Sequence, residues 1–105
     1  MFNKENCNLL AREVNGSFES CYRDGVVTGA KITVNNWVVS IQWGPGTYSD
    51  SGDAGDCMAI SKTAEIAAWK SDSSDMRQWH KFGYDNVLGY QSFERVREFV
   101  KKLGH

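Results

Sequence analysis

The chain has 105 residues and a net charge of −1, with 41% apolar residues, 12% aromatic residues and one proline. This length suits one domain with a single core, and the composition is that of a folded globule rather than a disordered tail. The small net charge excludes the strongly basic balance of most nucleic-acid binders and the strongly acidic balance of nucleic-acid mimics. We therefore expect one domain over residues 1–105 that does not bind nucleic acid directly.

Apolar patterning and cysteine usage indicate a soluble protein of the cytoplasm. No apolar run approaches the roughly 20 residues that span a bilayer, and residues 1–6 are too polar for a secretion signal. Cys7, Cys21 and Cys57 form an odd set without CxxC spacing, which favours a reducing compartment. We expect no membrane contact.

The first 25 residues predict a short helix followed by a strand. Asn3 or Asn6 can cap a helix that runs to Val14 and ends at the glycine of Asn15-Gly16. From Ser17 to Arg23 the side chains alternate as in a strand, and Asp24-Gly25 is a turn signal. Both elements are short.

The clearest local pattern is a β-hairpin over residues 30–43. Two alternating runs flank Asn35-Asn36, and asparagine tolerates the positive φ that a two-residue turn requires. Such a turn pairs Val34 with Trp37 and Ile32 with Val39. The apolar residues of both runs then share one face, so we expect Trp37 and Trp43 to lie in the core.

A long polar segment follows this hairpin and is the first candidate binding site. Residues 44–56 are rich in Gly, Ser and Asp, and connections of this length are often functional. The candidate contact residues in it are Tyr48, Asp50, Asp53 and Asp56. Three aspartates can ligate Ca²⁺, but a spacing of three does not fit an EF-hand, so we predict a protein-contact or solvated loop without metal.

Residues 58–82 predict two more strands. Met58–Lys70 has the alanines of a helix, yet Ala64, Ile66 and Ala68 alternate, and we favour a strand. Residues 71–75 then form a hairpin loop before a returning strand over Met76–Phe82. The candidate binding residues on this second pair are Trp69, Arg77 and Trp79, because an exposed tryptophan beside an arginine is a typical interaction hot spot.

The last element is an amphipathic helix. Ser92 is a good N-cap, Val96 and Val100 belong to an apolar stripe, and Gly104 follows as the C′ residue. The stripe is buried most simply against the apolar face of the sheet. The fold class is therefore α+β: an antiparallel sheet of about four strands packed against a C-terminal helix, with a short N-terminal helix.

Catalytic and metal-binding interpretations rest on few residues. His80 with one of the three cysteines would make a Cys–His pair or a zinc site, but their separations match no known spacing. Free cysteines are most often small buried hydrophobic residues. We predict a protein that is not an enzyme and has no cofactor or metal.

Three segments together resemble a family of small uncharacterised proteins encoded by tailed bacteriophages and prophages. They read VSIQWGPGTYSD at residues 39–50, TAEIAAW at 63–69 and VLGYQS at 87–92, and the resemblance covers roughly residues 30–103. The family has no agreed reaction or catalytic residues to carry over. It implies a context: small phage accessory proteins commonly bind a host or phage protein, including components of bacterial defence systems such as CRISPR complexes.

The sequence thus favours a non-enzymatic phage or prophage protein that binds a protein partner in the bacterial cytoplasm. The alternative is a small-ligand protein that sequesters a nucleotide, with aromatic faces stacking on the base. A homodimer through a strand edge or a surplus aromatic face stays open. An Asp/His or Cys/His enzyme is the third hypothesis.

Overall fold

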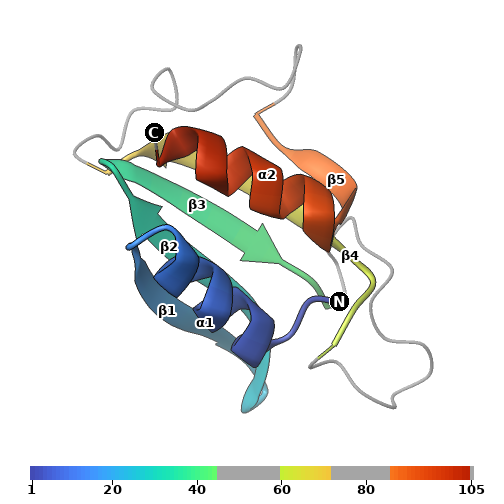
Figure 1. Cartoon of the computed structure of the whole chain (residues 1–105). Coiled ribbons are helices and arrows are strands. Elements are labelled where there is room, and N and C mark those ends of the chain that lie inside the picture. The colour runs from blue at the N-terminus through green and yellow to red at the C-terminus, as the bar shows by residue number, and fades with distance from the viewer. Residues whose placement is uncertain (45–59, 72–85, 105) are drawn as a thin grey trace.

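The computed structural model describes residues 1–44, 60–71 and 86–104. In chain order the elements are α1 (Lys4–Glu13), β1 (Ser17–Arg23), β2 (Val26–Val34), β3 (Trp37–Gln42), β4 (Thr63–Lys70), β5 (Leu88–Ser92) and α2 (Phe93–Leu103). The strands form one antiparallel sheet in the order β1-β2-β3-β4-β5. Both helices lie on the same face of the sheet, α1 over β1 and β2 and α2 over β4 and β5 (Figure 1).

The α+β prediction is confirmed, and the described sheet has five strands where about four were expected. The additional strand is β5, which lies beside β4 and pairs Leu88 with Ile66 and Ser92 with Thr63. The predicted loop after Ser71 and the returning strand over Met76–Phe82 lie outside the described residues. The strand predicted within Met58–Lys70 is β4, and its Ala64, Ile66 and Ala68 are buried as expected.

The two predicted turns fix the first three strands. Asn35 and Asn36 adopt φ of 49° and 69°, and the register pairs Val34 with Trp37 and Ile32 with Val39, as predicted. Asp24 and Gly25 adopt φ of 51° and 79° and join β1 to β2. Two successive residues with positive φ give the twist that a tight hairpin needs. Local chemistry therefore sets the register of β1, β2 and β3.

Each helix begins at its predicted cap. The side chain of Asn3 accepts a hydrogen bond from the Asn6 amide at 2.8 Å, and that of Ser92 accepts one from the Arg95 amide at 3.3 Å. Gly104 follows the last residue of α2, as predicted, but it is the C-cap and has a φ of −80° rather than the left-handed conformation common at helix ends. A Cβ there would lie 3.3 Å from Cγ2 of Val34, so this glycine allows close packing on β2.

The core lies between the sheet and the two helices. Its largest fully buried side chains include Trp43, Phe2, Leu10, Ile32 and Ile41. The Phe2 ring packs 5.9 Å from the Trp43 ring and 5.2 Å from the Phe93 ring, between centroids. Phe2 also exchanges backbone hydrogen bonds with Ser61 at 2.7 and 3.0 Å. The polar first residues therefore contribute a core residue that the sequence pattern did not indicate.

An ion pair connects the two helices above the sheet. Nε of Arg97 donates to both carboxylate oxygens of Glu13 at 3.1 Å, and Nζ of Lys101 lies 3.3 Å from Oε1 of Glu13. The guanidinium and the ammonium lower the pKa of Glu13. The pKa of Arg97 is raised in turn by the same carboxylate. The pair is exposed to solvent, so its contribution to stability is small.

Candidate functional site

Among the seven binding residues predicted from the sequence, the structure describes Trp69. The other six lie outside the described residues: Tyr48, Asp50, Asp53, Asp56, Arg77 and Trp79. Trp69 is in β4 opposite Val38 of β3 and is half-buried. Its side chain points away from α1 and α2, because Ala68 and Lys70 occupy the helix side of the same strand. The one predicted binding residue that the structure describes therefore lies on the sheet face opposite the helices.

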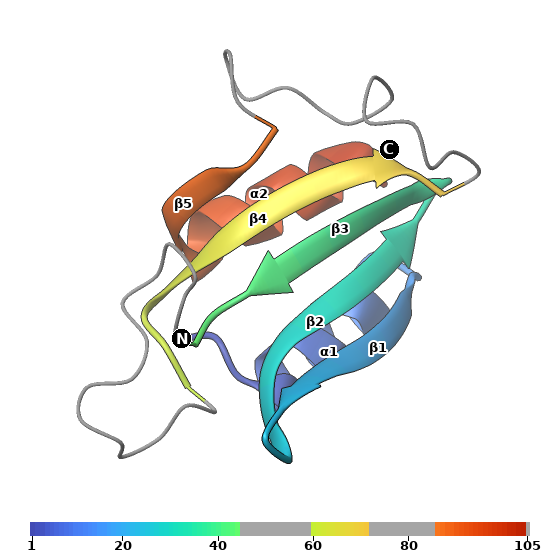
Figure 2. The same cartoon turned by 180° about the vertical axis from the view of Figure 1, so that it is seen from behind.

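We call this face the back face, and it is the one seen in Figure 2. The strand registers place three cross-strand rows on it, each contributed by β1, β2, β3 and β4 in turn. The rows are Ser17, Thr33, Val38, Trp69; then Glu19, Lys31, Ser40, Ala67; then Cys21, Gly29, Gln42, Glu65. Neither helix lies on this face.

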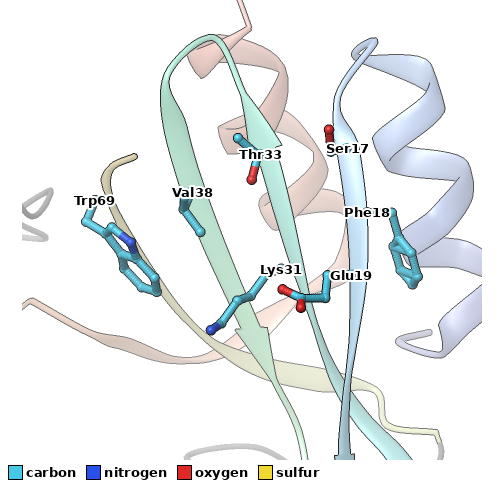
Figure 3. A pocket seen from close by; sticks show the side chains of 7 residues that line it. All are labelled: Ser17, Phe18, Glu19, Lys31, Thr33, Val38 and Trp69. Atoms are coloured by element: carbon cyan, nitrogen blue, oxygen red, sulfur yellow. The ribbon is translucent and has the colours of Figure 1, made fainter. Parts of the chain in front are cut away.

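An open depression of about 330 Å³ occupies the first two rows of the back face. Its lining residues are Ser17, Phe18, Glu19, Lys31, Thr33, Val38 and Trp69 (Figure 3). The Trp69 ring stands at one side, and the Lys31 side chain extends from β2 across β3 toward it (Figure 3). The Phe18 ring lies on the α1 side of β1 (Figure 3). Over the back face, the described lining residues therefore combine the large aromatic side chain of Trp69, the aliphatic side chain of Val38, a cation and an anion.

The charges of the depression oppose each other. Glu19 of β1 is directly opposite Lys31 of β2, on the same face. A cross-strand pair of opposite charges is modestly favourable and leaves little net field above the sheet. Recognition here would depend on shape and specific contacts rather than on attraction to a polyanion or polycation.

In the third row, the Gln42 side chain makes hydrogen bonds along its own strand and across the sheet. Nε2 of Gln42 donates to Oγ of Ser40 at 3.1 Å and to Sγ of Cys21 at 3.5 Å. To reach Cys21 it crosses Gly29, where a Cβ would overlap the Gln42 amide. Gly29 therefore provides the space through which β3 contacts β1 over the back face.

The segment predicted as the binding loop leaves the sheet far from Trp69. Gly44 follows β3 with a φ of +120°, and a Cβ there would lie 3.1 Å from Cβ of Thr28. Both conditions favour glycine. Val38, the partner of Trp69, is at the other end of β3, about 20 Å away at roughly 3.3 Å per residue. The structure thus does not bring the root of this segment together with Trp69.

The tryptophans of the hairpin divide between two environments. Trp43 is fully buried, as predicted, and its Nε1 has no hydrogen-bond partner among the residues that the structure describes. Trp37 packs against the margin of the core and is half-buried, with Nζ of Lys70 4.5 Å from its ring centroid. This cation–π pair was missed because the pairing of Trp37 with Lys70 depends on how β4 returns beside β3.

The cysteines described by the structure differ in environment. Cys7 belongs to the buried side of α1, and burial raises the pKa of its thiol from an ordinary 9.0 to about 12. It stays protonated at neutral pH and is a poor nucleophile. Cys21 is half-buried on the back face, whereas Cys57 and His80 lie outside the described residues. Within residues 1–44, 60–71 and 86–104, no three His, Cys, Asp or Glu side chains gather as metal ligands would.

Comparisons with protein-family models, curated proteins and solved structures found no match. In the described part of the chain, neither helix has the length and apolar character needed to cross a bilayer.

The sequence contained a signal for the back face that site prediction did not use. In an antiparallel hairpin the residues between the buried ones share the opposite face, so burial of Ile32 and Val34 implies that Lys31 and Thr33 point away from the core. That Glu19 and Trp69 lie beside them depends on the pairing of four strands.

Proposed function

We propose that this chain is a non-enzymatic accessory protein of a bacteriophage or prophage that binds a host or phage protein through its back face. The supporting observation is the depression bounded by Trp69, Val38, Lys31 and Glu19. A large aromatic side chain beside an aliphatic one, with polar and charged residues around them, is a common arrangement at protein interfaces. Trp69 was also a candidate on sequence grounds alone.

Three features favour a protein partner. The depression is open rather than enclosed, and an open sheet face suits an extended surface more than a small molecule. Its charges are balanced, which disfavours a nucleic acid. Cys7, a candidate nucleophile, has a strongly raised thiol pKa, which disfavours the Cys/His enzyme hypothesis and so favours binding over catalysis. The phage context rests on the resemblance of residues 30–103, and a bacterial defence complex such as a CRISPR effector is the first class of partner to test.

The test is affinity capture from a bacterial host lysate with four tagged proteins. They are the wild type, Trp69→Ser on the back face, Leu9→Ser as the control on α1, and a variant with Tyr48, Asp50, Asp53 and Asp56 changed to Ala. Leu9 is exposed on α1, so it offers an apolar-to-polar change away from the back face. Circular dichroism and thermal unfolding establish that each variant is folded before capture.

We expect a partner that the wild type and Leu9→Ser retain and that Trp69→Ser loses, with at least a tenfold weaker Kd once the partner is purified. A partner lost only by the four-residue variant moves the site to residues 48–56. Capture of nothing by folded wild type, with unchanged phage plating on defence-carrying hosts after deletion of the gene, contradicts the proposal.

A nucleotide-binding function is the second candidate, and one observation favours it. The depression has the volume of a small-ligand site and holds an aromatic ring and a cation, which suit a base and a phosphate. Glu19 opposes the phosphate. Thermal-shift measurements with millimolar nucleotides decide the question, since a ligand that binds the native state must raise Tm. An unchanged Tm removes this candidate and leaves the protein-binding proposal unaffected.

A further inference from the structure

The two edges of the sheet differ in how well they can accept another strand. β1 is the edge strand on the α1 side, and within residues 1–44, 60–71 and 86–104 it pairs with β2 alone (Figure 2). β5 is the edge strand on the other side in the described part, and its Tyr90 has a φ of 54°, which interrupts the extended backbone. An edge strand presents unpaired amide and carbonyl groups that can bind a further strand. The seven-residue β1 is the better template.

The bulge in the β1–β2 pair leaves β1 regular. Cys21 pairs with Gly29 and Tyr22 with Val27, so the unpaired extra residue is Thr28 of β2. None of the seven residues of β1 is proline, and no residue of β1 has a positive φ. Edge strands are often protected from pairing by charged side chains, which repel a second copy when they are all of one sign. β1 instead carries one acid, Glu19, and one base, Arg23.

The charge pattern of β1 is complementary to itself. Glu19 and Arg23 are both exposed and lie two residues before and two residues after Cys21. Alternate residues of a strand share a face, so these three side chains are on the back-face side. If a second β1 pairs antiparallel with the two-fold axis at Cys21, each Glu19 is directly opposite the other copy's Arg23.

Neighbouring registers lack this property. A two-fold axis at Ser20 places Glu19 opposite Cys21, and an axis at Tyr22 places Arg23 opposite Cys21. Opposite charges that face each other across strands are favourable, whereas like charges are not. An axis perpendicular to the sheet also keeps the helices of both copies on one side, so that the two sheets join into one and the two back faces become continuous.

We propose that a second copy of this chain pairs with β1, antiparallel and centred on Cys21, with Glu19 of each copy against Arg23 of the other. The interface is isologous, as in most homodimers. Glu19 also lines the depression, so the two surfaces adjoin at β1. The proposal is nevertheless tested separately from the proposed function, because the oligomeric state is measured on the chain without any partner protein.

A charge swap tests the register. Sedimentation equilibrium on the full chain gives the dimer Kd of the wild type, of Glu19→Arg, of Arg23→Glu and of the variant that carries both changes. Each single change makes two repulsive pairs and should raise Kd at least tenfold, and the double variant should return to within about threefold of the wild type. Glu98→Arg on exposed α2 is the matched control and should leave Kd within about twofold.

Cysteine cross-linking gives a second measurement. Directly opposed residues in antiparallel strands have Cα atoms about 4.5–5.5 Å apart, within the range of a disulfide. Mild oxidation with copper phenanthroline should therefore link the wild-type chains through Cys21, and Cys21→Ser should abolish that link. A chain that stays monomeric over the micromolar range overturns the proposal, as does a dimer whose Kd is the same in all charge variants.

Discussion

The two faces of this sheet are made from the same strands, yet one is fixed by packing and the other by a few polar contacts. On the helix side Ile32, Val39 and Ile41 are fully buried beneath α1 and α2. On the back face, the interleaved Lys31, Val38 and Ser40 are only partly buried. One face is therefore sufficient to build the core, which leaves the other able to carry contact residues at little cost in stability.

The largest expected difference between the two sides of the sheet is in the reactivity of Cys7 on α1 and Cys21 on the back face, two of the three cysteines. With a thiol pKa near 12 against an ordinary 9.0, Cys7 has about 1000-fold less thiolate at neutral pH. We expect iodoacetamide to modify native Cys7 at least 1000-fold more slowly than urea-unfolded Cys7, while back-face Cys21 is modified far sooner. Peptide mapping by mass spectrometry follows each cysteine separately. Equal rates for Cys7 in native and unfolded protein would show that α1 does not protect it.

Adjacent valines of β3 provide a matched pair for stability. Val39 is fully buried and Val38 is on the back face. Val39→Ala should lower the free energy of unfolding by about 2 kcal/mol, because it removes buried methyl groups and leaves a cavity, and Val38→Ala by less than about 1 kcal/mol. Urea unfolding measures both. A larger loss for Val38→Ala would mean that the back face is packed as firmly as the core.

Substitution of Gly29 tests how easily the side chains of the back face rearrange around an added methyl group. The added methyl group of Gly29→Ala meets the end of the flexible Gln42 side chain, so we expect a loss of less than about 1 kcal/mol. In a Gln42→Ala background the same substitution should cost nothing or stabilise slightly, because alanine restricts the unfolded chain. Urea unfolding of the four proteins gives the coupling. An equal cost in both backgrounds would exclude Gln42 as the cause.

The smallest effect concerns the ion pair above the helix side. The pKa of Glu13 is lowered in the folded protein, so its contribution to stability is present above the ordinary pKa of 4.5 and is lost as the pH falls through the folded value. Glu13→Gln should therefore lower Tm slightly at pH 7 and not at acid pH. Glu65→Gln on the back face is the control. A Tm difference that persists below the folded pKa would point to packing rather than charge.

Local signals in the sequence determined much of the fold. The Asn35-Asn36 and Asp24-Gly25 turns fixed two hairpins, because their backbone geometry suits residues that tolerate positive φ. Asn3 and Ser92 determined where the helices begin, because their side chains accept hydrogen bonds from the first turn. Alternation determined which residues of β2, β3 and β4 are buried.

Tertiary structure alone decided what these elements place side by side. The return of β4 beside β3 puts Trp69 against Val38 and Lys70 against Trp37, and no local rule fixes a pairing that spans more than 20 residues. Other contacts likewise join distant segments. They are the backbone hydrogen bonds between Phe2 and Ser61, the pairing of β5 with β4, and the contact of Glu13 with Arg97. The physical reason is that turns and caps act within a few residues, whereas the back face and its depression exist only once four strands have paired.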